Sequence, residues 1–101
     1  MDSTVSSAPS FIEPAAMGYT IYTKPGCPYC VRVKNLLEAR GVIGITLVEC
    51  ENYLLEARDE FLAFIAARAG KEYKTFPMVF EDGQFIGGFM DTKGHLDKKI
   101  D

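Results

Sequence analysis

The chain has 101 residues, of which 48% are hydrophobic and 25% charged, a composition typical of one ordinary globular domain. Its formal net charge of -3 argues against a nucleic-acid or anionic-membrane surface as the main partner. No apolar run approaches the roughly 20 residues that a membrane-spanning helix needs. Residues 1–16 lack the basic start and apolar stretch of a signal peptide, so we expect a cytoplasmic protein.

Residues 1–18 differ in composition from the rest of the chain. Residues 2–18 hold four Ser, one Thr, two Pro and three Ala, which offer few side chains to pack. We interpret residues 1–18 as a flexible tail whose removal would change stability little. The folded domain is then expected to span residues 19–101.

The first half of the domain predicts a strand, a helix and a second strand. Residues 19–23 are β-branched and aromatic, as in a strand. A helix is predicted over residues 27–40, because Pro28 fits its first turn and Gly41 fits a C-terminal stop. Residues 45–48 predict a second strand, parallel to the first through a right-handed crossover.

One helix and a hairpin are predicted next. Apolar residues at helical spacing over residues 54–65 predict a single helix that ends before Gly70. Residues 78–80 and 85–86 predict a β-hairpin, because Asp82-Gly83 between them is a strong turn dipeptide.

The last predicted element is a helix that Asp91 or Thr92 can cap and that runs to Ile100. The complete order is β-α-β-α-β-β-α. This order predicts an α/β domain in which a four-stranded mixed sheet is flanked by helices.

Three cysteines are too few for a disulfide scaffold in a chain long enough to build its own core. The close pair Cys27 and Cys30 indicates redox chemistry or metal binding instead. A zinc site could recruit Cys50 and His95, but these two residues form no local pair of the usual spacing. We expect that Cys50 lies in the core and that His95 lies on the surface.

Cys27 has the setting of a nucleophile. A thiol attacks as its thiolate, and a free thiol with a pKa of about 8.5 is only slightly ionised at neutral pH. Cys27 stands where the predicted helix begins, so its sulfur can face unpaired amides and the positive end of the helix dipole. Lys24 adds a nearby positive charge. Cys30 follows one helical turn later, close enough to form a disulfide with Cys27.

Three segments together point to a known family. They are Lys24-Pro-Gly-Cys-Pro-Tyr-Cys30, Thr75-Phe-Pro77 before a strand, and Gly87-Gly-Phe-Met-Asp91 after a hairpin. In order and separation they resemble the motifs of dithiol glutaredoxins of the CPYC type, and the resemblance covers residues 19–101. It implies a thioredoxin-like fold, with Pro77 in a cis peptide beside the cysteine pair and a glutathione groove along one edge.

The resemblance also implies roles for individual residues. Cys27 is the nucleophile, Cys30 is the resolving thiol, and Lys24 holds the glycine carboxylate of glutathione. Tyr29 is expected to form a wall of the glutathione groove. Thr75, Phe76 and Pro77 are expected to contact the cysteinyl part, which pairs with the Phe76 backbone, and Gly87 and Gly88 let the tripeptide approach. The Met90 amide and the Asp91 carboxylate are expected to bind the two charged ends of the γ-glutamyl group.

Two positions depart from the family pattern. Met90 stands where family members often carry a hydroxyl residue, and Thr92 is the expected substitute donor. Phe76 is bulkier than the valine that is common there. Arg68 is a further candidate for the glycine carboxylate, beside Lys24.

The implied activity is glutathione-dependent reduction of protein disulfides and glutathione mixed disulfides. We expect glutathione as the reducing cosubstrate, no tightly bound cofactor or metal, and a ribonucleotide reductase as one protein partner. We also expect a monomer that binds neither nucleic acid nor membranes.

Two alternatives stay open. One is a thioredoxin-like reductant fed by a flavin reductase, which Lys24 and the Gly-Gly-x-x-Asp run disfavour. The other is an iron–sulfur carrier in which Cys27 and glutathione from two protomers ligate a cluster. The family resemblance makes this second alternative less favoured, because Pro28 after the nucleophile rigidifies the loop and disfavours cluster assembly.

Overall fold

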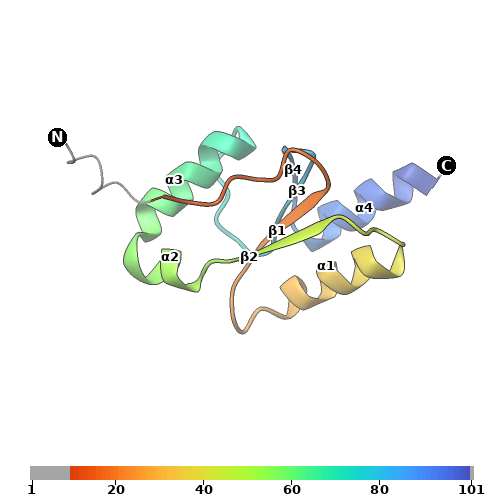
Figure 1. Cartoon of the computed structure of the whole chain (residues 1–101), viewed down its shortest axis with the longest axis horizontal. Coiled ribbons are helices and arrows are strands. Elements are labelled where there is room, and N and C mark those ends of the chain that lie inside the picture. The colour runs from red at the N-terminus through yellow and green to blue at the C-terminus, as the bar shows by residue number, and fades with distance from the viewer. Residues whose placement is uncertain (1–9, 101) are drawn as a thin grey trace.

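A four-stranded mixed sheet separates two layers of helices (Figure 1). The computed structural model describes residues 10–100. Its strands are β1 (Tyr19–Thr23), β2 (Ile45–Glu49), β3 (Met78–Glu81) and β4 (Gln84–Gly87), and its helices are α1 (Pro28–Ala39), α2 (Glu51–Glu56), α3 (Arg58–Ala69) and α4 (Phe89–Ile100). The strand order in the sheet is β2-β1-β3-β4. β1 is parallel to β2 and antiparallel to β3, which is antiparallel to β4. This confirms the predicted α/β domain with a mixed sheet.

Each face of the sheet carries its own hydrophobic core. Successive residues of a strand point to opposite faces, so Ile21 and Tyr22 of β1 enter different cores. Ile21 packs with Leu37 of α1 and Leu96 of α4, whereas Tyr22 packs with Phe61 of α3. Figure 1 shows α1 and α4 side by side on one face, with α3 on the other. Within residues 10–100 no helix is long and apolar enough to cross a membrane.

The register of the sheet brings three loops to one end of its strands. β1 pairs Tyr22 with Met78, so the chain that follows β1 meets the chain that precedes β3. β3 pairs Val79 with Gly87, so the chain that follows β4 reaches the same end. The cysteine loop, the Phe76-Pro77 loop and the start of α4 therefore share one end of the sheet.

The segment between β2 and β3 holds two helices, so the prediction of a single helix is wrong. Ala57 separates α2 from α3 in a non-helical conformation, with φ -151° and ψ 50°. Asp59 and Glu60 lie in the first turn of α3, where acidic side chains favour a helix start. The apolar periodicity continues across this break and conceals it. The predicted end before Gly70 is confirmed.

α4 begins at Phe89, before both of the predicted cap residues. Asp91 lies in the first turn, and its Oδ2 accepts a hydrogen bond from the Gly88 amide at 3.1 Å. The Thr92 hydroxyl donates to the Gly88 carbonyl at 2.8 Å. Both side chains reach back to the residue before the helix, so they stabilise its start from inside the first turn.

His95 is less exposed than predicted. Its Nε2 lies 2.6 Å from Oε1 of Glu81, and Nζ of Lys99 lies 2.6 Å from Oε2 of the same carboxylate. The side chains of His95 and Glu81 are 33% and 19% exposed. Two residues of α4 thus hold the end of β3. The tertiary packing creates this pair, so no local sequence pattern reveals it.

Residues 10–18 pack on the domain, so the prediction that they have little to pack is wrong; residues 1–9 lie outside the described residues. The centroid of the Phe11 ring lies 4.9 Å from that of Tyr53, 5.5 Å from that of Phe61 and 5.3 Å from that of Phe64. These partners belong to α2 and α3, far along the chain. Composition alone therefore gave no sign of the contact.

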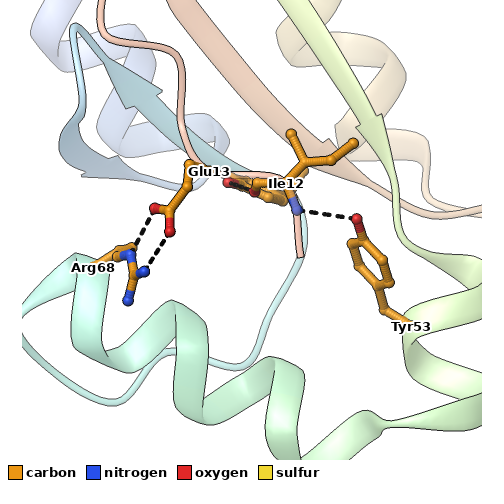
Figure 2. A network of polar contacts seen from close by, with 5 residues as sticks. Ile12, Glu13, Tyr53 and Arg68 are labelled. Atoms are coloured by element: carbon orange, nitrogen blue, oxygen red, sulfur yellow. Dashed lines mark hydrogen bonds and ion pairs between the residues drawn. The ribbon is translucent and has the colours of Figure 1, made fainter. Parts of the chain in front are cut away.

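Polar contacts fix the same segment (Figure 2). The Ile12 amide donates to the Tyr53 hydroxyl at 3.1 Å, and the Ile12 carbonyl accepts from the Tyr22 hydroxyl at 2.6 Å. The Glu13 carboxylate accepts two hydrogen bonds from Arg68, one of them from Nε at 2.8 Å. These bonds hold the pKa of Glu13 below its usual value. Residues 10–18 therefore form an N-terminal strap, in which Phe11, Ile12 and Glu13 contact α2 and α3.

Removing the Phe11 ring should destabilise the domain. We expect Phe11→Ala to lower the free energy of unfolding by about 2 kcal/mol, because a half-buried ring leaves an aromatic cluster. Met17→Ala is the matched control in the same strap, since Met17 is 84% exposed. Urea unfolding followed by circular dichroism measures both variants. Equal stability of the two would contradict the packing of the strap.

Candidate functional site

Cys27 and Cys30 enclose the first turn of α1. They form a disulfide, with Cα atoms 5.3 Å apart. Cys27 is the N-cap residue, and its Sγ accepts a hydrogen bond from the Cys30 amide at 3.2 Å. Pro28 takes the first helical position, where its missing amide costs nothing. Cys27 is half-buried and Cys30 is only 4% exposed, so an incoming disulfide meets Cys27 first.

This geometry suits nucleophilic sulfur chemistry at Cys27. Amides at a helix N-terminus and the positive end of the helix dipole stabilise an anion placed there. A thiolate, not a thiol, is the attacking species in disulfide exchange. Cys30 lies behind Cys27, within bonding reach of its sulfur. The pair can therefore form and resolve a mixed disulfide.

A groove of about 250 Å³ opens beside the cysteine loop. Its walls come from the first turn of α1, the loop before β3 and the start of α4; they are Tyr29, Tyr73, Thr75, Phe76, Pro77, Gly88, Phe89, Met90 and Asp91. The Phe76-Pro77 peptide is cis, as the sequence resemblance implies. A larger hollow of about 630 Å³ lies between β4 and α4, but no residue of the cysteine loop or the cis-proline loop lines it.

Lys24 and Tyr29 connect the cysteine loop to the other two segments. The Lys24 ammonium lies 5.3 Å from the centroid of the Phe76 ring, a cation–π distance. Tyr29 is 50% exposed, and its ring centroid lies 5.6 Å from that of Phe89. The structure thus brings residues of all three sequence motifs together around one groove.

Gly87 and Gly88 make room for side chains of this chain. Gly87 has a φ of 132°, and a side chain there would collide with the Asp91 carboxylate. A Cβ atom on Gly88 would lie 2.9 Å from the Tyr73 hydroxyl. The space above Gly88, which was expected to receive the tripeptide, is therefore shared with Tyr73.

Two expected binding residues are engaged elsewhere. Thr92 is fully buried, and its hydroxyl is bonded to the Gly88 carbonyl, so the prediction that it replaces a donor missing at Met90 is wrong. The Arg68 guanidinium is bonded to Glu13 and lies 4.3 Å from the centroid of the Phe64 ring. Its charge is therefore committed to the N-terminal strap.

Three residues that the sequence did not assign contribute to the site. The Arg32 guanidinium lies 5.1 Å from the centroid of the Tyr29 ring and brings a second positive charge close to the cysteine loop. Tyr73 and Phe89 line the groove. Phe89 stands inside one of the three sequence motifs, so its place in that motif could have identified it. Tyr73 belongs to no motif, and the path of the chain between α3 and β3 decides its place.

Comparison with known proteins settles the family. The family model described as Glutaredoxin matches residues 19–86. The chain belongs to the glutaredoxin family. Glutaredoxin 1 of Rickettsia felis is 34% identical to it over 86 residues, which cover 80% of this chain and 78% of that protein.

Solved structures of glutaredoxins agree with this assignment. Glutaredoxin 1 from Francisella tularensis, in complex with cacodylate, has a TM-score of 0.69 and 30% identity, over 81% of this chain and 94% of that chain. A buckwheat glutaredoxin–glutathione complex has a TM-score of 0.63 and 30% identity, over 81% and 71% of the two chains. These likenesses confirm the thioredoxin-like fold. With its Cys27–Cys30 pair, this glutaredoxin is a glutathione-dependent thiol–disulfide oxidoreductase.

The third cysteine of this glutaredoxin lies in the core, which confirms the prediction for Cys50. It is fully buried, its Sγ donates to the Val48 carbonyl at 3.4 Å, and its amide donates to the Thr23 carbonyl at 2.8 Å. Burial raises the pKa of the Cys50 thiol to about 12. In the part of the chain that the structure describes, no three Cys, His, Asp or Glu side chains gather where they could hold a metal ion.

Alkylation should distinguish the cysteines of the reduced glutaredoxin. Near pH 8, Cys50 should react about a thousandfold more slowly in the folded protein than in urea, because its raised pKa leaves almost no thiolate. Cys27 should react first. Iodoacetamide labelling with peptide mass spectrometry gives each rate. Labelling of native Cys50 at the rate of Cys27 would show that Cys50 is not held in the core.

Proposed function

We propose that this glutaredoxin reduces mixed disulfides between glutathione and other thiols, and that protein disulfides are its second class of substrate. The observation that carries the proposal is a half-buried Cys27 at a helix N-cap, with Cys30 buried behind it and the groove opening beside them. A tripeptide of extended shape can lie in such a groove with its sulfur at Cys27.

The reaction with a glutathione mixed disulfide needs one cysteine of the enzyme. The Cys27 thiolate attacks the glutathione sulfur, the old S–S bond breaks, and the released thiolate takes a proton from water. Cys27 now carries glutathione. The thiolate of a second glutathione attacks the glutathione sulfur of this adduct, which returns Cys27 as a thiolate and forms glutathione disulfide.

The reaction with a protein disulfide uses both cysteines. Cys27 attacks one sulfur of the substrate and forms a mixed disulfide, and the other substrate sulfur leaves as a thiol. Cys30 then attacks Cys27, releases the second substrate thiol and closes the Cys27–Cys30 disulfide. That disulfide is the state of the present structure. Two molecules of glutathione restore the dithiol and leave as glutathione disulfide.

Charge complementarity supports an orientation for glutathione in the groove. Lys24 stands on the cysteine loop and takes the glycine carboxylate, with Tyr29 as a wall. Asp91 stands at the start of α4 and takes the γ-glutamyl ammonium, while the Met90 amide takes the neighbouring carboxylate. Thr75, Phe76 and Pro77 lie between these two ends and pair with the cysteinyl part. Each ligand charge then meets an opposite charge or dipole.

The setting that we propose is a reducing, cytoplasmic compartment in which the protein acts as a monomer on disulfides such as that of a ribonucleotide reductase. Few cysteines, with only one pair in bonding reach, support the reducing compartment. The family match supports glutathione as the reductant over a flavin reductase. Absence of visible absorbance in the purified protein would argue against the iron–sulfur carrier.

Exchange of each active-site cysteine should separate the two reactions. Cys27→Ser should abolish both, whereas Cys30→Ser should keep the reduction of glutathione mixed disulfides and lose most reduction of protein disulfides. The reason is that free glutathione can resolve a small adduct, but a bulky mixed disulfide needs Cys30 at a high effective concentration. Cys50→Ser is the matched control and should keep both. A coupled assay with glutathione and its reductase measures turnover, and activity of Cys27→Ser would refute the proposal.

The two functions of Asp91 can be separated by charge. Asp91→Asn keeps an oxygen for the Gly88 amide but loses the negative charge, so it should raise the KM for glutathione mixed disulfides about tenfold with little change in kcat. Asp91→Ala should raise the KM equally and also destabilise the protein by about 1 kcal/mol, because the helix start loses its acceptor. Asp97→Asn, on the same helix, should leave the KM unchanged. An unchanged KM in Asp91→Asn would place the γ-glutamyl ammonium elsewhere.

A further inference from the structure

Tyr73 is the one aromatic residue of the groove that comes from the chain between α3 and the cis-proline loop. Its ring is held edge-on against Phe85 of β4, with centroids 4.8 Å apart. An edge-on aromatic pair is a favourable packing that fixes the ring plane. The ring is therefore oriented by the sheet, and its hydroxyl is carried toward the groove.

The hydroxyl of Tyr73 lies above the peptide that joins β4 to α4. A Cβ atom on Gly88 would be 2.9 Å from this oxygen and 3.8 Å from the Pro77 carbonyl oxygen. The hydroxyl thus stands where the cis-proline loop meets the start of α4. Glycine at this position is what lets the hydroxyl approach the backbone so closely.

This hydroxyl is an unused donor. No hydrogen bond to it is found among residues 10–100, and Tyr73 is only half-buried at the groove. The other hydroxyl near the start of α4, that of Thr92, is buried and already donates to the Gly88 carbonyl. Met90, which is 71% exposed, offers only a thioether. Of these three side chains, Tyr73 is therefore the one whose hydroxyl is free, among residues 10–100, to meet a ligand above Gly88.

We infer that Tyr73 is a specificity residue that donates a hydrogen bond to the γ-glutamyl α-carboxylate of the substrate. The inference rests on the proposed orientation of glutathione, with its γ-glutamyl group at the start of α4. A carboxylate there lies within reach of both the α4 amides and the Tyr73 hydroxyl. A hydrogen bond to a charged group is stronger than one between neutral groups, so this donor favours glutathione over thiols that lack the γ-glutamyl group.

The test compares two substrates with the pre-reduced protein in single-turnover experiments. One is a peptide that carries glutathione as a mixed disulfide, and the other carries cysteinylglycine, which lacks the γ-glutamyl group, on the same cysteine. Tyr73→Phe keeps the ring against Phe85 and removes only the hydroxyl. It should raise the half-saturating concentration of the glutathione substrate about tenfold, leave the maximal rate unchanged, and leave the cysteinylglycine reaction unchanged.

Tyr53→Phe is the matched control, because it also removes one tyrosine hydroxyl but acts only on the N-terminal strap. It should leave both substrates unaffected, and thermal unfolding checks that both variants are folded. Suppose that the parent protein prefers the glutathione substrate, but that Tyr73→Phe leaves the half-saturating concentration of this substrate unchanged or lower. The inference about Tyr73 is then wrong, and the proposed orientation of glutathione is not affected. If the parent protein shows no preference between the two substrates, the proposed orientation of glutathione fails, and the inference fails with it.

Discussion

The central strand β1 is the constraint on which the site depends. Its pairing with β3 places Tyr22 opposite Met78, and the pairing of β3 with β4 places Val79 opposite Gly87. A shift of one residue in either ladder would turn each side chain of the moved strand to the other face. The two hydrophobic cores exclude such a shift, so they also fix the meeting of the cysteine loop, the cis-proline loop and the start of α4.

The start of α4 shows how a ligand site can be formed from the requirements of a helix end. Asp91 and Thr92 satisfy the amide and the carbonyl of Gly88, and Gly87 is left without a side chain because Asp91 occupies that space. Asp91 also lines the groove. In the proposed orientation of glutathione, its carboxylate can therefore stabilise the helix start and bind the γ-glutamyl ammonium at the same time.

The N-terminal strap ties the helical layer of α2 and α3 to the chain that enters β1. Phe11 joins an aromatic cluster with Tyr53, Phe61 and Phe64, and Glu13 engages Arg68. An exposed ion pair contributes little on its own, so the aromatic packing dominates. The same contact commits the Arg68 charge to the strap, whereas Lys24 and Arg32 lie beside Phe76 and Tyr29 of the site.

The sequence by itself determined the features that depend on neighbouring residues. The strand at residues 19–23, the Pro28 helix, the Asp82-Gly83 turn and the Cys27–Cys30 pair follow from local geometry, and the three motifs identify the family. Only the tertiary structure decided the break at Ala57, the packing of Phe11, the pairing of His95 with Glu81, the burial of Thr92 and the place of Tyr73. Each of these depends on a partner distant in the chain or on a backbone path that local propensity leaves open. These features form only when the sheet sets the distances between segments. Local sequence patterns therefore do not predict them.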